Sequence, residues 1–187
     1  RRSARWRCWC SPTRRRGSRT GDAGEPVGLD AQDRTGWDAA LLGEGVAVLD
    51  RAMRLGRPGP YQLQAAVAAV HSQAPSVSET DWAQIAALYG TLEQIDPSPV
   101  VTINRAVAVA HADGPHAGLE LLAPLEHDDR LARYQPLHAS RAELLHRAGD
   151  VDGARAAYRR AIALTDNTRE RAALERRAAT LPGAAHA

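Results

Sequence analysis

Apolar and small residues recur at helical spacing along most of the chain, and the pattern is most regular between residues 142 and 161. Such spacing places the members of a group on one face of a helix. It predicts two short antiparallel helices whose small residues let the two backbones approach closely, with a tyrosine filling the gap between them. The positions concerned, with the turn that separates them, are Ala142, Leu145, the Gly149-Asp150 turn, Ala154, Tyr158 and Ala161.

Two less complete copies of this pattern lie upstream. The first copy consists of Ala106, Val109, the Asp113-Gly114 turn, Gly118, Leu122 and Leu125, and the second keeps only Ile85, Tyr89 and Leu92. Together the copies resemble the tetratricopeptide repeat, a helix–turn–helix unit of about 34 residues that buries its apolar face by stacking on neighbouring units. His138 and Arg141 depart from the pattern, because they stand where the repeat prefers apolar residues, and Asp166 replaces its closing proline.

Helical periodicity, together with the Gly and Pro residues that interrupt it, predicts eight helices. Thr35, Thr80 and Ser98 are the expected N-caps, and Pro136 is expected to kink or delay the helix that contains it. No stretch shows the alternation of a strand, so the predicted fold class is all-α, a tetratricopeptide-like antiparallel helical repeat (an α-solenoid) with a disordered N-terminal tail. The expected helices span residues 37–55, 60–74, 81–95, 99–112, 115–125, 129–148, 151–164 and 168–181.

Composition divides the chain into three parts: a disordered basic tail and linker over residues 1–30, the helical-repeat domain over residues 31–182, and a frayed tail over residues 183–187. Eight arginines lie in the first 19 residues, beside tryptophans that could stack on nucleic-acid bases. We favour a disordered or artefactual tail, because a GC-rich back-translation of this segment reads as an apolar helix in another frame. The chain opens with Arg and its only methionine is Met53, so we expect a fragment.

Charge limits the kinds of partner that the body of the chain can bind. From Thr20 onward there are 16 arginines, no lysine and 22 acidic residues, a net charge of −6. Nucleic-acid binding depends mainly on phosphate neutralisation, so we expect no direct nucleic-acid binding by residues 20–187. No apolar run reaches membrane-spanning length and no signal-peptide pattern opens the chain. We therefore expect a cytoplasmic, protein-binding domain.

Chemistry-bearing residues are few in this sequence. The two cysteines, Cys8 and Cys10, have neither a zinc-knuckle nor a redox spacing. The seven histidines form no metal-ligating pattern, and the acidic pairs Asp128-Asp129 and Asp150-Val-Asp152 stand at helix starts, where carboxylates cap helices. The serines lack a nucleophile motif. The prediction is a protein with no cofactor and no catalytic site, hence not an enzyme.

Two polar clusters are the candidate protein-interaction sites. Asn104 and Arg105 lie in the first helix of a repeat, the helix that lines the concave face of such stacks. They could hold a partner carboxylate or bridge helices by hydrogen bonds, and the sequence does not separate these roles. Asp33 and Arg34 precede Trp37 and form either a docking knob or a helix cap with an amphipathic anchor.

Five ordered motifs carry a resemblance to a known family. They are Gln32-Asp-Arg-Thr-Gly-Trp-Asp38, Gly59-Pro-Tyr-Gln-Leu-Gln-Ala-Ala66, Asp81-Trp82 with Gln84-Ile85, Ser98-Pro-Val-Val101 with Asn104-Arg-Ala-Val-Ala108, and Glu170-Arg171 with Leu174-Glu-Arg-Arg177. In this order they resemble the long C-terminal extension of bacterial extracytoplasmic-function (sigma-24 type) RNA polymerase sigma factors. The resemblance covers roughly residues 22–181. In that family a tetratricopeptide-like domain follows the two DNA-binding sigma regions.

The resemblance implies a role in transcription initiation, with partners in the sigma core regions, RNA polymerase or another protein. The promoter-reading regions, including a helix-turn-helix, are absent from these residues, so the fragment is not expected to recognise a promoter. The alternative is a free-standing tetratricopeptide adaptor that binds a peptide in its groove. An enzyme is a third class, which would need a pocket with converging polar groups.

Overall fold

The computed structural model describes residues 39–56 and 58–182, and every regular element in those two ranges is a helix. The fold class is therefore all-α, as predicted. The described chain divides into two compact units, with the boundary between Pro97 and Ser98. The segments over residues 1–38 and 183–187, including the predicted tail and the predicted N-cap Thr35, lie outside the described residues.

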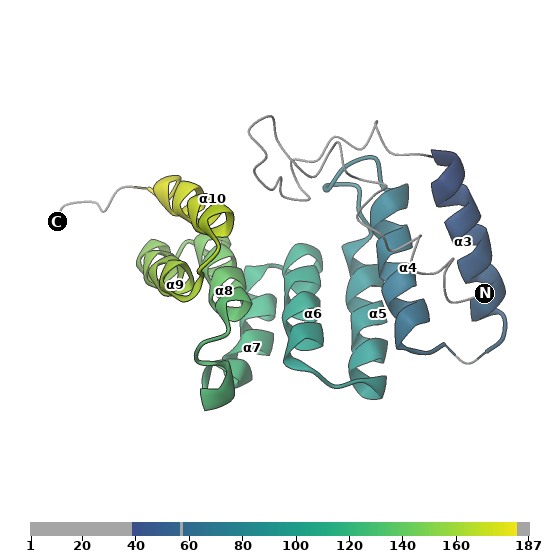
Figure 1. The fold of residues 1–187 in the computed structure, drawn as a ribbon, viewed down its shortest axis with the longest axis horizontal. Helices are drawn as coiled ribbons and strands as arrows, with labels where there is room; N and C mark the ends of the chain where they lie inside the picture. The colour runs from purple at the N-terminus through teal and green to yellow at the C-terminus, as the bar shows by residue number, and fades with distance from the viewer. Residues whose placement is uncertain (1–38, 57, 183–187) are drawn as a thin grey trace. The chain divides into compact units, whose positions relative to one another are not determined.

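The first unit contains three helices, α3 (Ala39–Met53), α4 (Pro60–Gln73) and α5 (Trp82–Ile95), and α4 packs against both others (Figure 1). Leu49 of α3 is buried against Ala65 and Ala69 of α4. The side chain of Asp81 caps α5 by accepting the N–H of Gln84 at 2.8 Å. The prediction that Thr80 caps this helix is wrong, because the Thr80 hydroxyl donates to the Ser76 carbonyl instead.

The second unit is built from two helical hairpins and a final helix (Figure 1). The helix α6 (Pro99–Ala112) pairs with α7 (Pro115–Glu126), and α8 (Gln135–Ala148) pairs with α9 (Val151–Leu164). A 3₁₀ turn, η2 (Asp129–Leu131), joins the hairpins, and α10 (Thr168–Ala179) packs on α9.

Helix boundaries in this unit follow local signals. Ser98 caps α6, as predicted, through a bond from Val101 N–H to its hydroxyl. Gly149 ends α8 with φ of 86°, a left-handed conformation that suits glycine. The predicted helix over 129–148 starts late instead, at Gln135. Pro136 lacks an N–H and restricts the residue before it, so it sits at the start of α8.

The α8–α9 hairpin encloses one apolar cluster, to which α10 contributes one leucine and the segment after α10 another. The predicted face residues Ala142, Leu145, Ala154, Tyr158 and Ala161 are all buried in it, with Leu174 and Leu181. Tyr158 is 1% exposed and fills the space between the small residues. A second cluster joins α6 to α7 and α8 and contains Ala106, Leu122 and Leu144.

Gly118 of α7 lies tightly against α6. A methyl group added there would lie 2.6 Å from the Ala106 carbonyl oxygen, 2.7 Å from the Ala110 methyl and 2.9 Å from the Leu144 side chain. One of these atoms is backbone and cannot move independently of its helix. The glycine therefore fixes the distance between the two helices.

Gly118→Ala is expected to destabilise the protein by about 1–3 kcal/mol through overpacking. Gly43→Ala is the matched control, because a methyl group at this helical glycine meets nothing within 4 Å and should stabilise α3 by about 0.5–1 kcal/mol. Urea unfolding followed by circular dichroism measures both. A Gly118→Ala midpoint equal to that of the wild type would contradict the tight contact.

Candidate functional site

The predicted pair on α6 is divided between two environments. Asn104 is exposed, whereas Arg105 is partly buried on another side of the helix. Asn104 shares an exposed stripe of α6 with Val100, which is 48% exposed, and with His111. The three positions are separated by four and seven residues, the spacing of one helix face. Asn104 is therefore the member of the pair that a partner can reach. The other predicted cluster, Asp33, Arg34 and Trp37, lies outside the described residues.

Acidic residues that the sequence placed at helix starts do cap helices. Asp150 accepts the Gly153 N–H at 2.8 Å at the start of α9, and Asp128 accepts the Arg130 N–H at 3.0 Å at the start of η2. The hydrogen bonds and ion pair with Arg130 lower the pKa of Asp128. Across the described ranges no group of three or more His, Cys, Asp or Glu side chains could hold a metal ion.

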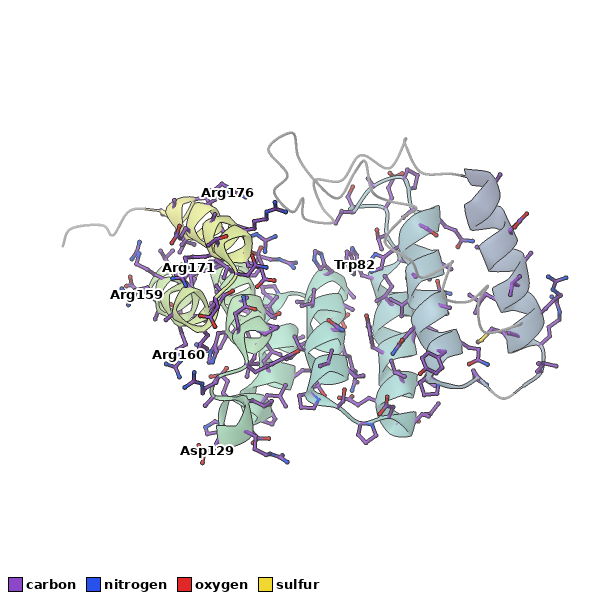
Figure 2. The ribbon with its side chains drawn as sticks, viewed as in Figure 1. Trp82, Asp129, Arg159, Arg160, Arg171 and Arg176 are labelled. Carbon is purple, nitrogen blue, oxygen red and sulfur yellow. The ribbon has the colours of Figure 1, made fainter. Side chains whose placement is uncertain are left out.

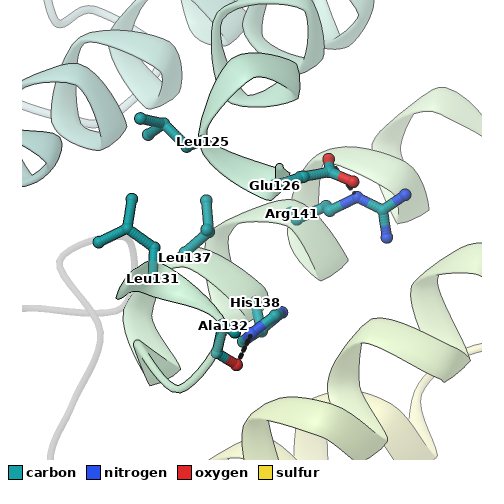
Figure 3. Close-up of a pocket in the computed structure, with 7 residues that line it drawn as sticks. All are labelled: Leu125, Glu126, Leu131, Ala132, Leu137, His138 and Arg141. Atoms are coloured by element: carbon teal, nitrogen blue, oxygen red, sulfur yellow. Dashed lines mark hydrogen bonds and ion pairs between the residues drawn. The ribbon is translucent and has the colours of Figure 1, made fainter. Parts of the chain in front are cut away.

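Three leucines from three successive elements form the apolar side of a surface pocket (Figure 3). Leu125 lies in the last turn of α7, Leu131 ends η2 and Leu137 lies in the first turn of α8. Leu137 is 1% exposed, while the other two are half-buried. The pocket holds about 130 Å³. An apolar cavity of about 150 Å³ accommodates benzene, so this pocket matches one aliphatic side chain.

The polar side of the pocket is formed by Glu126, His138 and Arg141. Arg141 Nε donates to Glu126 Oε1, and the side chains of this ion pair are 32% and 31% exposed. The terminal nitrogens of Arg141 extend past the carboxylate (Figure 3) and bond to no other described residue. A partly exposed pair of this kind contributes about 0–1 kcal/mol to the stability of the fold. The guanidinium of Arg141 can therefore donate hydrogen bonds to a second carboxylate with little loss of stability.

The segment over residues 127–134, here called the pocket loop, is held to both helices of the α8–α9 hairpin through one backbone carbonyl. Ala132 O accepts a hydrogen bond from His138 Nε2 at 3.1 Å and another from Arg160 Nη2 at 3.1 Å. His138 belongs to α8 and Arg160, labelled in Figure 2, belongs to α9. Because Leu131 precedes this carbonyl, the two bonds also position the loop side of the pocket.

The sequence alone did not indicate this pocket. The apolar side of the pocket combines one residue from the end of a helix, one from a turn and one from the start of the next helix. The signal that marks it is the pair His138 and Arg141. Both occupy positions where the repeat pattern prefers apolar side chains. In the structure, these positions form the rim of a space that larger apolar residues would fill.

A buried phenol connects α9 with α8. Tyr158 donates a hydrogen bond to Glu143 Oε2 at 2.9 Å. Burial, followed by the charge and hydrogen bond of Glu143, raises the pKa of Tyr158 well above the ordinary value, and Arg177 opposes the shift. The phenol therefore stays protonated and acts as a structural donor.

Comparison with known proteins shows one long relative. The uncharacterized protein R00370 of Rhizobium meliloti (strain 1021) is 48% identical over 149 residues, which cover 80% of this chain and 35% of that protein. The chain thus spans about a third of the length of this curated relative. No family model and no solved structure matches the chain. Of the helices that the structure describes, none combines the length and apolar character needed to cross a membrane.

Tyr158→Phe is expected to lower the free energy of unfolding by about 1 kcal/mol at pH 7, because one hydrogen bond is lost. It should also remove part of the alkaline instability. The raised folded-state pKa of Tyr158 contributes stability that is complete below the unfolded pKa of about 10 and is lost as pH rises above it. Urea midpoints between pH 8 and pH 11 measure the difference from the wild type.

The control for this variant is Tyr61→Phe, because Tyr61 is 79% exposed. It should follow the wild type at every pH. Equal pH dependence of wild type and Tyr158→Phe would contradict the assigned shift.

Arg160→Ala is expected to accelerate amide hydrogen exchange in the 127–134 loop several-fold, because Ala132 O loses one of its two donors. Arg159→Ala provides the matched control. Arg159 is the exposed neighbour on α9 (Figure 2) and forms no hydrogen bond or ion pair with a described residue. Exchange mass spectrometry resolves the loop peptide. Equal exchange in the two variants would show that Arg160 does not hold the loop.

Proposed function

We propose that this chain is a tetratricopeptide-like regulatory domain of a bacterial extracytoplasmic-function sigma factor and that it works by protein–protein contact in the cytoplasm. The observation that carries the proposal is the ordered set of five sequence motifs spread over residues 32–177. The all-helical fold is compatible with them, and the long relative offers a precedent for a domain of this kind within a larger chain.

The repeat part of the proposal is supported by the packing of the second unit. The α8–α9 hairpin buries four alanines, and Tyr158 is buried among them: Ala142, Ala154, Ala157 and Ala161. A repeat of this type buries its outer faces against neighbouring units. In the second unit α7 packs against α8 and α10 packs against α9, so the α8–α9 hairpin is covered on two sides.

The surface charge supports a protein partner. Residues 20–97 carry 4 arginines and 11 acidic residues, whereas Ser98–Ala187 carry 12 arginines and 11 acidic residues. Arginines interspersed with carboxylates favour specific ion pairs with another protein over binding to a phosphate backbone. We assign the partner to the sigma core regions or to RNA polymerase, and Asn104 to the contact surface.

The direct test is transcription in vitro with the complete gene product, including the sequence encoded upstream of Arg1, and RNA polymerase core enzyme of the same organism. Removing the domain, from residue 20 onward, is expected to change transcript yield by about fivefold or more, the lower range of a regulatory coupling. Unchanged yield would contradict a regulatory role. An upstream sequence without sigma regions would contradict the sigma assignment and favour the adaptor.

A point variant separates contact from loss of folding. Asn104→Ala is expected to weaken binding to the sigma–polymerase complex about 2- to 10-fold, because one hydrogen bond is removed. Its unfolding midpoint should equal that of the wild type, since Asn104 is exposed. Arg130→Ala is the control, because the Arg130 side chain is 87% exposed in a surface pair with Asp128 and is not assigned to the contact. Equal binding by both variants would remove Asn104 from the contact surface.

A further inference from the structure

We propose that the pocket formed by Leu125, Leu131 and Leu137 is a docking site for a protein segment that inserts one aliphatic side chain and places an adjacent carboxylate on Arg141. The inference rests on the proposed function in taking a protein as the partner, and it names the chemistry of the contact. It concerns a different surface from Asn104, which lies on α6.

The first argument is the space itself. The pocket of about 130 Å³ opens on three leucines, and Leu137 at its base is 1% exposed. Burying an aliphatic side chain there removes apolar surface of both partners from water. Position 138, where the repeat pattern prefers an apolar residue, carries His138 instead, and its ring is turned to the Ala132 carbonyl. His138 therefore lines the pocket without filling it.

The second argument is charge. Arg141 uses Nε for Glu126 and presents its terminal nitrogens beyond that carboxylate (Figure 3). A guanidinium offers five N–H donors in a planar fork, which suits a second carboxylate. Arg133 and Arg160, on the pocket loop and on α9, have no carboxylate within ion-pair distance among the described residues. Glu126, Asp128 and Asp129 lie beside these arginines, so a carboxylate is favoured at this position by the unused donors of the Arg141 fork and not by the net charge of the surroundings.

The third argument is that the pocket is held open. The Ala132 carbonyl is bonded from α8 and from α9, and Asp128 caps the turn that carries Leu131. Leu131 therefore has little freedom to collapse onto Leu137. A preformed site loses less conformational entropy when it binds than one that must be ordered.

The test uses small probes with the intact chain. N-acetyl-leucine carries both features of the proposed segment, N-acetyl-leucine amide lacks the carboxylate, and N-acetylglycine lacks the side chain. We expect N-acetyl-leucine to give saturable ¹H–¹⁵N shift changes at the pocket residues with a dissociation constant of about 1–10 mM. The amide should bind about threefold or more weakly and N-acetylglycine about tenfold or more weakly.

Two variants identify the groups. His138→Trp should fill the pocket and abolish the shifts. Arg141→Gln provides a second test that does not depend on filling the pocket: without the guanidinium, and with Glu126 still in the lining, N-acetyl-leucine should bind no more tightly than its amide. Arg159→Gln is the matched control, an exposed arginine on α9 outside the pocket lining, and should bind as the wild type does.

The following results would overturn the proposal. N-acetyl-leucine could fail to shift the pocket residues, or N-acetylglycine could bind as tightly. Concentration-dependent dimerisation that His138→Trp abolishes would show that a second copy occupies the pocket. Neither the probes nor the variants involve a sigma factor or a polymerase, so a negative result here leaves the transcription test to decide the proposed function separately.

Discussion

Close approach between helix backbones is the constraint on which the second unit depends. Alanine and glycine occupy many of the buried contact positions, and larger residues such as Tyr158 and Leu122 pack among them. A helix pair of this kind gains many weak dispersion contacts over a short length. Helices of 12 to 14 residues are marginal in isolation, so the hairpins exist because of this packing.

Tight packing in the hairpins contrasts with the connection between them. The segment from His127 to Tyr134 contains only a 3₁₀ turn, and side chains of α8 and α9 hold it through the Ala132 carbonyl. Polar residues therefore determine the structure where the repeat pattern is least regular. The pocket of the second unit lies at this place, so a potential binding site lies beside a rigid scaffold.

Local sequence signals predicted most of the helices. The bounds of α6 and α9 agree with the expectation because each has a strong cap and a defined stop, such as Asp150 before α9. The predicted cap Thr80 was wrong, because the carboxylate of Asp81 reaches the Gln84 N–H instead. The expected start at residue 129 was too early, whereas the prediction that Pro136 delays this helix is confirmed by the start of α8 at Gln135.

The candidate site was less predictable, because it depends on contacts between elements. Helical periodicity indicated that Asn104 and Arg105 differ from their neighbours but not which of them is exposed. The pocket needs the ends of two helices and a turn to meet, and a period along one helix does not contain that information. His138 and Arg141 were recognised as departures from the repeat, yet their role follows only from the side chains opposite them.

The shared carbonyl of Ala132 makes the pocket conditional on the assembly of the hairpin beside it. Its two donors belong to helices that are adjacent only after α8 and α9 have packed. A chain emerging during synthesis completes Leu125, Leu131 and Leu137 before Arg160 exists, and at that stage the loop has one tether instead of two. Any partner that needs the fixed loop would consequently select fully folded molecules and leave nascent ones to finish folding.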